Sequence, residues 1–538
     1  MKLRRNYRLL ILLVVIVVGT TLLLGNQRIQ AYTVLGNSKV ATGTIDYNNQ
    51  IAVFDDSIVH SIQILMDEDD YQAMLTTYQQ TSEKDYFHAD VIVDGVKVTD
   101  VGIRLKGNAS LRTALGGMGR MAGGFNPRGD QGGEDSPQFN PDEMQNFRER
   151  QAPPDDGQRL GRSQFALPED GQLPIQPEGA ELPELPAGGV QTIIRGQGGM
   201  GQNTQIPLLI CFDKFVEGQT YQGFTKIAIR SAGISYKASM LQEPITNFVF
   251  QLAGLPATDT AFAGVQLNDG TMELFTISEV IEEEFLEKYF VNPDGILYKA
   301  EVQAQLSYQG DDPSAYARSF SQETRVNDAD LAPLIRFLQF LSTSDDETFD
   351  RELSGWLDVE SFAGYLAVNN LLVNIDSMAG MGNNYYLYYD DSAERFTILY
   401  WDGNESLGGL AMGSQVSSFD IYYQNTGSGR MPMGTGMGMD NSSTLLVKRF
   451  LASASFTQLY EQKLVEIYHE AFTSGAIDQK IEQYAGLIRA ANDEGSLVAK
   501  EDYEQSLASV LSFVTERQAY LASTPLLSSE ASVNSLNN

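Results

Sequence analysis

The sequence is poor in the side chains on which many enzyme centres depend. Its 538 residues include one cysteine, Cys211, and three histidines, His60, His88 and His469. A lone cysteine cannot form an internal disulfide or a zinc site, and the apolar run IPLLICF around it favours a buried small side chain. The histidines lie far apart and have no motif around them, which argues against a histidine-based triad or metal site. Any chemistry must therefore depend on carboxylates, amides and lysines.

Positive charge is also scarce. Lysine and arginine number 37 against 70 acidic residues, which gives a formal net charge of −33. Such a surface repels phosphate backbones, so we expect no nucleic acid among the partners. It suits a well-hydrated protein or one that meets basic partners. The length predicts two or three domains, or one large unit with insertions.

One long apolar run is present, and it lies at the N-terminus. Basic residues precede an uncharged stretch, Leu9 to Gly25, which has about the minimum length for crossing a bilayer. We favour an uncleaved signal anchor with everything after about Asn26 outside the membrane. A signal peptide cleaved after Ala31 is the close alternative. The predicted localisation is therefore a bacterial membrane-anchored protein with an extracytoplasmic domain, or a protein secreted to the cell surface, and only this helix contacts the membrane.

Composition and periodicity divide the rest of the chain. Regions that alternate like strands or repeat like helices are interrupted by stretches rich in Gly, Pro, Gln and Met, which cannot bury enough apolar area to offset their ordering entropy. The predicted parts are a signal segment at 1–32, a β-rich part at 33–114, a disordered insertion at 115–202, a mixed α+β core at 203–424, a flexible Gly/Met-rich loop at 425–442, a helical part at 443–524 and a disordered tail at 525–538.

The most strongly patterned stretch is 373–409. Within it, NYYLYYD and RFTILYW are strand-like runs joined by the turn DDSAE. Antiparallel pairing places Asn384 and Asp402 side by side at the open end of this hairpin, and a flexible loop brings Asp376 to the same end. Mg²⁺ prefers oxygen ligands and keeps several waters, so Asp402 and Asn384 suit a metal while Asp376 could orient a hydroxyl nucleophile. The alternative is ordinary turn and capping chemistry.

This arrangement follows the logic of a protein-kinase centre. There a loop aspartate accepts the substrate proton, and an asparagine and a second aspartate bind metal across the phosphates. A lysine should contact the nucleotide, and the best candidate is Lys299 in the strand GILYKA. Glu279, in FTISEVIEEEF, could position that lysine or line the pocket. The alternative for Lys299 is a solvated lysine at a strand end.

An ordered set of fragments resembles the CotH (spore-coat protein H) kinase family. The resemblance runs from about Val59 to Leu410, interrupted by the insertion. Its most specific part is N-x-D, N-x-Y-L-Y and W-D in that order, with G-x-L-Y-K upstream. The fragments are VGIRLKGNAS, GFTKIAI, FQLAGLPATDTAFAGVQLNDG, ISEVIEEEFLEKYF, GILYKA, YLAVNNLLVNIDS, NNYYLYYD and LYWDGNESLGG.

The resemblance implies an α+β, divergent protein-kinase-like fold with an N-terminal β-rich part, a central catalytic part at 203–424 and a helical C-terminal part. It further implies use of ATP with Mg²⁺ or Mn²⁺ to phosphorylate serines of a serine-rich protein substrate. By motif position, Asp376 looks like the catalytic aspartate. Asp402 looks like the metal-binding aspartate of W-D, and Asn384 resembles the amide that opens the N-Y-x-L-Y strand. Lys299 looks like the nucleotide-contacting lysine.

Other matches to the family are less complete. Glu279 matches its acid in the strand-to-helix segment. Arg104 and Lys106, in RLKGNAS, match a motif that could place positive charge near phosphates, although a structural β-turn is the alternative. The family often reads W-D-x-D, whereas Asn404 replaces the second carboxylate here, so metal affinity or the number of metals can differ.

Two functions remain open at this point. One is an exported or surface-anchored kinase that transfers the γ-phosphoryl of ATP to protein serine. The other is a non-catalytic cell-surface or spore-coat binding or structural protein on the same scaffold. An export signal places the domain where ATP is scarce, which favours the second function.

Overall fold

A computed structural model describes residues 51–107, 109–115, 205–232, 239–302, 304–409, 416–422 and 444–528. These residues all belong to one compact unit that begins at Tyr47. The predicted signal anchor, the insertion after residue 115, the Gly/Met-rich loop and the tail beyond residue 528 lie outside the described ranges. Within those ranges, no helix is long and apolar enough to cross a membrane.

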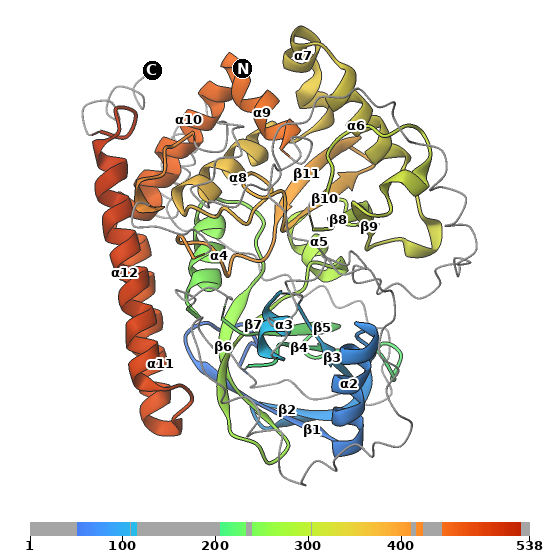
Figure 1. The fold of residues 1–538 in the computed structure, drawn as a ribbon, viewed down its shortest axis with the longest axis vertical. Coiled ribbons are helices and arrows are strands. Elements are labelled where there is room, and N and C mark those ends of the chain that lie inside the picture. Colours follow the sequence, from blue (N-terminus) through green and yellow to red (C-terminus); the bar gives the residue numbers. More distant parts are fainter. Residues whose placement is uncertain are drawn as a thin grey trace, which may run out of the picture. The chain divides into compact units, whose positions relative to one another are not determined.

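A closed β-barrel forms one part of the molecule, in the lower half of Figure 1, with strand order β1-β2-β3-β4-β5-β7-β6. Its strands are β1 (Val59–Met66), β2 (Phe87–Val93), β3 (Val96–Leu105), β4 (Leu208–Cys211), β5 (Lys226–Arg230), β6 (Thr260–Leu267) and β7 (Glu273–Ser278). Parallel pairing of β1 with β6 closes the barrel, and the other neighbours are antiparallel. The β-rich part before the insertion and the strands after it therefore share one barrel.

The turns and caps of the barrel follow from its sequence. Asp94 and Gly95 connect β2 to β3, and both have positive φ, 49° and 84°, as a two-residue hairpin turn of this hand requires. Asp67 caps α2 (Glu68–Thr81) by accepting a hydrogen bond from the Asp69 backbone. A short helix, α3 (Ala109–Ala114), follows β3. Between β5 and β6 runs α4 (Gln242–Leu252), which is buried along most of its length.

A second sheet lies above the barrel in Figure 1 and has the order β11-β10-β8-β9. Its strands are β8 (Ile296–Ala300), β9 (Phe320–Gln322), β10 (Tyr385–Asp390) and β11 (Arg395–Tyr400). The predicted hairpin is present, and its register pairs Tyr385 with Tyr400 and Asp390 with Arg395. Its open end is therefore at Tyr385 and Tyr400, and its turn end is at Asp390.

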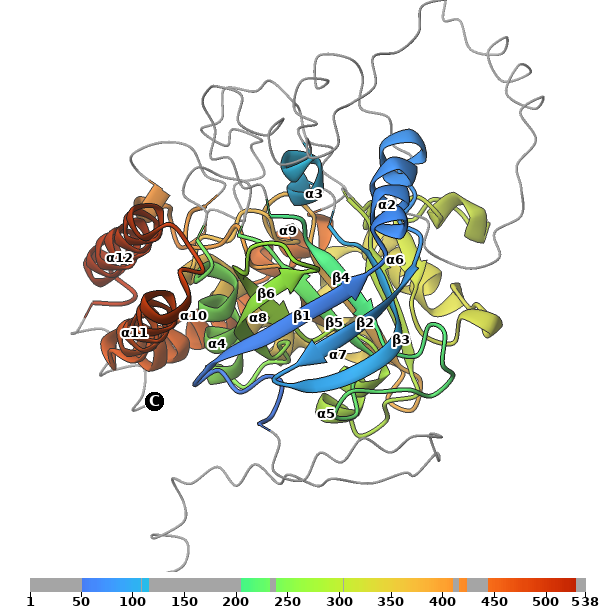
Figure 2. The ribbon, with the colours of Figure 1, turned by 90° about the horizontal axis from the view of Figure 1, so that it is seen from below.

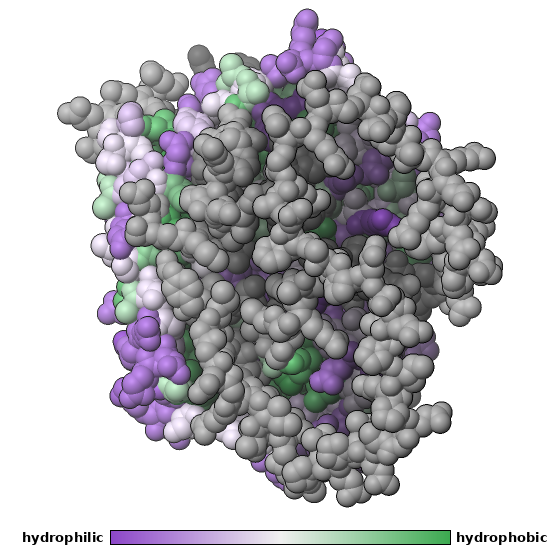
Figure 3. Space-filling view, viewed as in Figure 1, coloured by the Kyte–Doolittle hydropathy of each residue, from purple (hydrophilic) through white to green (hydrophobic). Residues whose placement is uncertain are grey.

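Helices complete the mixed α+β architecture, which confirms the predicted class; the closed barrel was not predicted. The helices are α5 (Glu283–Tyr289), α6 (Ala332–Thr343), α7 (Asp346–Trp356), α8 (Val359–Leu371), α9 (Leu445–Ala452), α10 (Ala454–Tyr468), α11 (Ala476–Gly495) and α12 (Lys500–Ser523). Residues 362–371 of α8 are all buried, so this helix lies in the core. The long helices α11 and α12 lie at one edge (Figure 2), and hydrophilic side chains gather over the lower part of this helix pair at the lower left of Figure 3.

Candidate active site

The open end of the β10–β11 hairpin carries two of the candidate residues. Asn384 directly precedes β10, and Asp402 follows β11 by two positions. Both have left-handed backbone conformations, with φ of 57° and 60°. Asn and Asp tolerate this region better than other side chains, yet it persists only where the surroundings impose it. The fold therefore holds both residues in defined positions.

Asp376 lies against the same end. The side-chain amide of Asn384 donates to Oδ2 of Asp376 at 2.9 Å, and that of Asn383 donates to Oδ1 at 3.0 Å. Burial, assisted by the nearby charge of Asp402, raises the pKa of Asp376 to about 6 against the hydrogen bonds from the two amides, which lower it. The structure thus brings Asp376, Asn384 and Asp402 together, and the amide nitrogen of Asn384 faces Asp376.

The loop that delivers Asp376 is more ordered than the sequence predicts. The backbone of Met381 donates to the carbonyl of Ile375 at 2.8 Å, and that of Gly380 donates to Ser377 at 3.0 Å. A Cβ on Gly380 would overlap the Ile375 carbonyl, so only glycine fits this turn. The expectation of a flexible loop is wrong, because backbone hydrogen bonds close SMAGMGN into a compact turn.

A buried arginine, which the sequence analysis missed, holds Asp402. Arg230, the last residue of β5, donates through a terminal nitrogen to Oδ1 of Asp402 and through Nε to Oε2 of Glu243 at 2.6 Å. Arg230 and Glu243 are 7% and 4% exposed. Burial raises the pKa of Glu243, although the guanidinium opposes this. One signal was available: Glu243 is the only charged residue in the otherwise apolar and neutral α4.

Further cations surround this pair. Nζ of Lys106 lies 5.0 Å from the centre of the Trp401 ring, as does Cζ of Arg230. Burial lowers the pKa of Lys106 to about 7, assisted by repulsion from Arg230, Lys299 and Arg104. Among the described residues, Lys106, Lys299 and Arg104 form no ion pair with a carboxylate. Three partly exposed cations therefore lie near Asp402 without an ion-pair partner in the described part of the chain.

Lys299 enters the site from β8. Its backbone lies opposite Tyr386 of β10 and Ser321 of β9, and the Tyr386 ring meets Trp401 edge-on, with ring centres 6.1 Å apart. Lys299 therefore lies on the strand directly next to the hairpin that carries the candidate acids. The predicted lysine, the predicted acids and Trp401 of the W-D motif lie around one region.

Glu279 is placed differently. It is 2% exposed, and its Oε2 accepts a hydrogen bond from the Asp259 backbone at 3.0 Å and lies 3.7 Å from Nζ of Lys288. Burial raises its pKa to about 7. The structure gives Glu279 Lys288 as its charged partner and does not bring it to Lys299. Its role in the pocket stays a prediction.

The donor set suits a magnesium ion held jointly with a ligand. Within the described ranges, no three His, Cys, Asp or Glu side chains are arranged to hold a metal. A cation at Asp402 and Asn384 would have one carboxylate and one amide oxygen from the protein and would take its other oxygens from water and phosphate, as Mg²⁺ commonly does. Four buried polar atoms in the segments that carry the candidate residues have no hydrogen-bond partner among the described residues: Arg104 Nε, Asn374 Oδ1, Tyr385 Oη and Tyr400 Oη. Such atoms are rare and point to a polar ligand or water.

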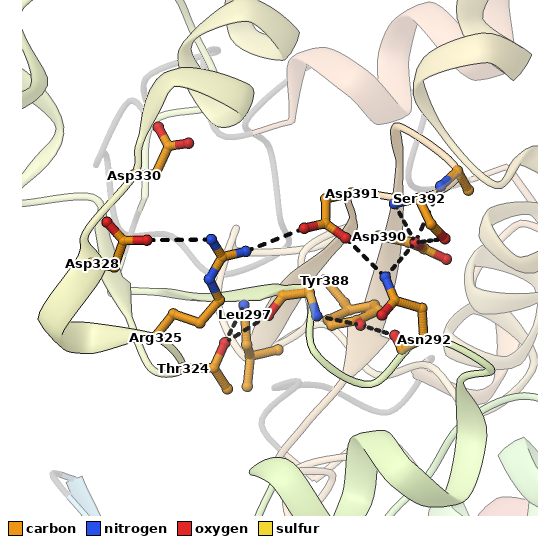
Figure 4. A network of polar contacts seen from close by, with 12 residues as sticks. Asn292, Leu297, Thr324, Arg325, Asp328, Asp330, Tyr388, Asp390, Asp391 and Ser392 are labelled. Carbon is orange, nitrogen blue, oxygen red and sulfur yellow. Dashed lines mark hydrogen bonds and ion pairs between the residues drawn. The ribbon is translucent and has the colours of Figure 1, made fainter.

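At the turn end of the same hairpin, by contrast, the polar side chains hydrogen-bond to one another and to the backbone (Figure 4). Oδ1 of Asp390 accepts hydrogen bonds from the backbone of Ser392 and from the amide of Asn292, both at 2.9 Å. Asn292 also donates to Asp391, whose other oxygen lies 3.3 Å from Arg325. A cavity of about 500 Å³ lies near this end, between α8 and α10, and none of the candidate residues lines it.

A comparison with known proteins identifies the family of the chain. Residues 193–521 match the family described as CotH kinase protein, a range that covers more than half of the chain. It includes every candidate residue except Arg104 and Lys106. No curated protein matches the chain. The resemblance noted in the sequence is confirmed, and the chain belongs to the CotH kinase protein family.

Proposed function

We propose that this chain is an ATP-dependent protein kinase that transfers the γ-phosphoryl group to serine hydroxyls of a protein substrate. The observation that carries the proposal is the convergence of Asp376, Asn384 and Asp402 with Lys106, Lys299 and Arg104, which form no ion pair among the described residues. A triphosphate with a divalent ion would supply the missing negative charge. Family membership supports the same class of activity.

A kinase-like arrangement of the barrel and the second sheet is part of the proposal. In protein kinases, a lysine on a barrel strand pairs with a glutamate on the following helix. Here Arg230 of β5 pairs with Glu243 of α4 in the same strand-then-helix order. The arginine cannot be deprotonated and presents a planar fork, which suits bidentate contacts with carboxylate or phosphate.

Each residue then has a task in the transfer. Bound Mg²⁺ or Mn²⁺, held by Asp402 and Asn384, would neutralise charge on the phosphates. Lys106, Lys299 and Arg104 bind phosphate oxygens. Asp376 orients the serine hydroxyl and accepts its proton, a task that a pKa of about 6 suits at neutral pH. Most of the rate acceleration comes from positioning and electrostatic stabilisation.

The remaining predictions belong to the same proposal. The apolar run at Leu9 to Gly25 supports export and a membrane anchor, with the kinase domain outside the cytoplasm or at the cell surface. The acidic surface supports a basic, serine-rich protein as the substrate.

The test is phosphoryl transfer by the purified full-length chain. Wild-type protein with labelled ATP and Mg²⁺ or Mn²⁺ should label itself or a serine-rich basic protein, and Asp402→Ala should reduce the rate by about 10³-fold or more, because the cation loses its carboxylate. The proposal is overturned if folded wild-type protein labels neither, or if Asp402→Ala leaves the rate unchanged.

A non-catalytic binding protein is the second candidate. Asn404 stands where a second carboxylate is common in the family, and the described residues supply no three-acid metal site. Thermal unfolding with and without Mg-ATP separates the candidates. A ligand that binds only the folded state stabilises it by about 2.7 kcal/mol when its concentration is 100 times its Kd. A scaffold without a working nucleotide site shows no shift in its unfolding temperature.

A further inference from the structure

The C-terminal helix α12 sends one arginine into the core beneath the candidate site. Arg517 is fully buried, although it is charged and lies far from the site in sequence. Its Nε donates to the carbonyl of Leu371 at 3.1 Å, and one terminal nitrogen donates to the carbonyl of Asn370 at 2.9 Å and to its side-chain oxygen at 3.2 Å. These carbonyls belong to the last turn of α8, whose orphan acceptors need donors.

Both acidic loops meet the chain at the end of α8. The loop toward Asp376 begins at Leu372, and the carbonyl of Leu372 accepts a hydrogen bond at 2.8 Å from the backbone of Leu407, in the loop that follows Asp402. Arg517 also donates to the carbonyls of Ser417 and Phe419, at 3.1 and 2.5 Å. One guanidinium therefore joins the end of α8 to the segment downstream of the Asp402 loop.

Backbone strain lies between this guanidinium and the candidate base. Val373 has φ of 49°, which is a genuine outlier for a β-branched residue. Such a conformation costs about 1–3 kcal/mol and persists only where its surroundings over-determine it. The surroundings on its N-terminal side are the carbonyls that Arg517 holds.

We propose that Arg517 is a positioning residue, which fixes the end of α8 and thereby places Asp376 and the Asp402 loop relative to each other. The helix α12 is then an integral part of the active centre. The catalytic consequence rests on the proposed kinase function, while the structural part does not. Misplacement of reacting groups by about 1 Å can cost about 10²-fold in rate.

The chain offers a matched control. Arg449 of α9 holds another helix end in the same way: it donates to the carbonyl of Leu341 at 2.8 Å and to that of Asp345 at 3.0 Å, at the junction of α6 and α7. Arg517→Met and Arg449→Met remove the same kind of contact from two junctions, and only the first adjoins the candidate site. Arg517→Lys keeps a cation and part of the donors.

The experiment is hydrogen–deuterium exchange on the full-length chain, followed by kinetics. Arg517→Met should accelerate amide exchange by about tenfold in peptides covering 371–378 and 403–409, whereas Arg449→Met should do so only around 341–346. The kcat should fall by about 10²-fold in Arg517→Met, with the KM for ATP changed less than about threefold, and Arg517→Lys should recover part of the loss.

The outcomes separate this proposal from the proposed function. Equal exchange around Asp376 in both methionine variants overturns the positioning role, as does an unchanged kcat in a folded Arg517→Met protein. If Arg517→Met does not fold, Arg517→Lys must show the same local acceleration on a smaller scale, and its absence overturns the proposal. An inactive wild-type protein with the expected exchange pattern defeats the kinase assignment alone.

Discussion

The two ends of the β10–β11 hairpin contain similar residues, but the pKa values of their aspartates are shifted in opposite directions. At the turn end, burial raises the pKa of Asp390, but hydrogen bonds from Asn292 and Ser392 outweigh it, and the net pKa is lowered. At the open end, burial and the charge of Asp402 outweigh the amides, so the pKa of Asp376 is raised. An acid whose ionised form is favoured stabilises the fold, whereas one held against an electrostatic cost is typical of a functional site.

The tyrosines of the hairpin repeat this contrast. At the turn end, the hydroxyl of Tyr388 accepts a hydrogen bond from the Gly295 backbone at 3.0 Å and donates to the carbonyl of Asn292. At the open end, Tyr385 and Tyr400 are paired across the strands, and their buried hydroxyls have no hydrogen-bond partner among the described residues. The turn end is complete without a ligand, and the open end is not.

The largest expected difference between the two ends is catalytic. Asp376→Ala should lower the rate of phosphoryl transfer by about 10²–10⁴-fold, because the substrate hydroxyl loses its proton acceptor. Asp390→Ala should leave the rate within about twofold and lower the stability by about 1 kcal/mol, since it loses the bonds that hold the turn. Initial rates and urea unfolding measure both. Equal rate losses in the two variants would erase the distinction between the ends.

Two glycines allow the same comparison by steric means. A Cβ on Gly403 would overlap the hydroxyl of Tyr400, and one on Gly295 would overlap the carbonyl of Tyr389. Both alanine variants should be destabilised by about 2–3 kcal/mol, but only Gly403→Ala should also weaken Mg-ATP binding, by about tenfold, since it displaces Asp402.

Thermal shifts with a titration of Mg-ATP read out this difference. Adding Tyr400→Phe to Gly403→Ala removes the closest clashing atom and should restore part of the stability. If Gly295→Ala weakened nucleotide binding as much as Gly403→Ala, displacement of Asp402 would not explain the weaker binding.

The pH response of Asp376 sharpens the comparison further. Its folded-state pKa of about 6 exceeds the ordinary value of 3.8, so the folded chain binds more protons than the unfolded chain between these values. Ionisation of Asp376 therefore lowers the free energy of unfolding progressively as the pH rises from about 4 to 6. Asp376→Asn should be more stable than wild type at pH 7 by about 2 kcal/mol, and this gain should narrow toward pH 4. Activity should change in the opposite direction, rising through pH 6 as Asp376 ionises.

The smallest expected effect concerns the tyrosine hydroxyls. Tyr388→Phe leaves the Gly295 amide without its acceptor and should cost about 1–2 kcal/mol. Tyr400→Phe removes a buried hydroxyl that has no protein partner and should be neutral or stabilise by less than about 1 kcal/mol. Chemical unfolding of the ligand-free variants measures both. A clear loss in Tyr400→Phe would mean that water already satisfies the open end.

Local patterns predicted the hairpin well. Two strand-like runs rich in aromatic residues and the turn DDSAE set its register, and the register alone places Asn384 and Asp402 at one end. The Asp94-Gly95 turn and the helices that follow Leu331 were predictable for the same reason. The family fragments predicted Lys299 by motif, where charge spacing gave no clear answer.

What the sequence could not reveal depends on long-range contacts. Closure of the barrel needs β1 to meet β6, which lie some 200 positions apart, and neither strand carries a local signal of its partner. The Arg230–Glu243–Asp402 chain joins three separate segments, and Arg517 reaches its acceptors from α12. The motif that includes Glu279 did not reveal its charged partner, because the ion pair with Lys288 of α5 depends on how the helix packs.

The pairing of β3 with β4 has a practical consequence. Lys106 and Pro207 are hydrogen-bonded backbone neighbours at 2.9 Å, although a long glycine- and proline-rich stretch separates them in sequence. A chain that departs and returns at adjacent points can be lengthened cheaply, since each doubling of a flexible loop costs only about 0.6 kcal/mol. The barrel therefore offers an insertion point beside Lys106, where a short linker, an affinity tag or a foreign domain can replace the stretch between the two strands while β3 and β4 stay paired.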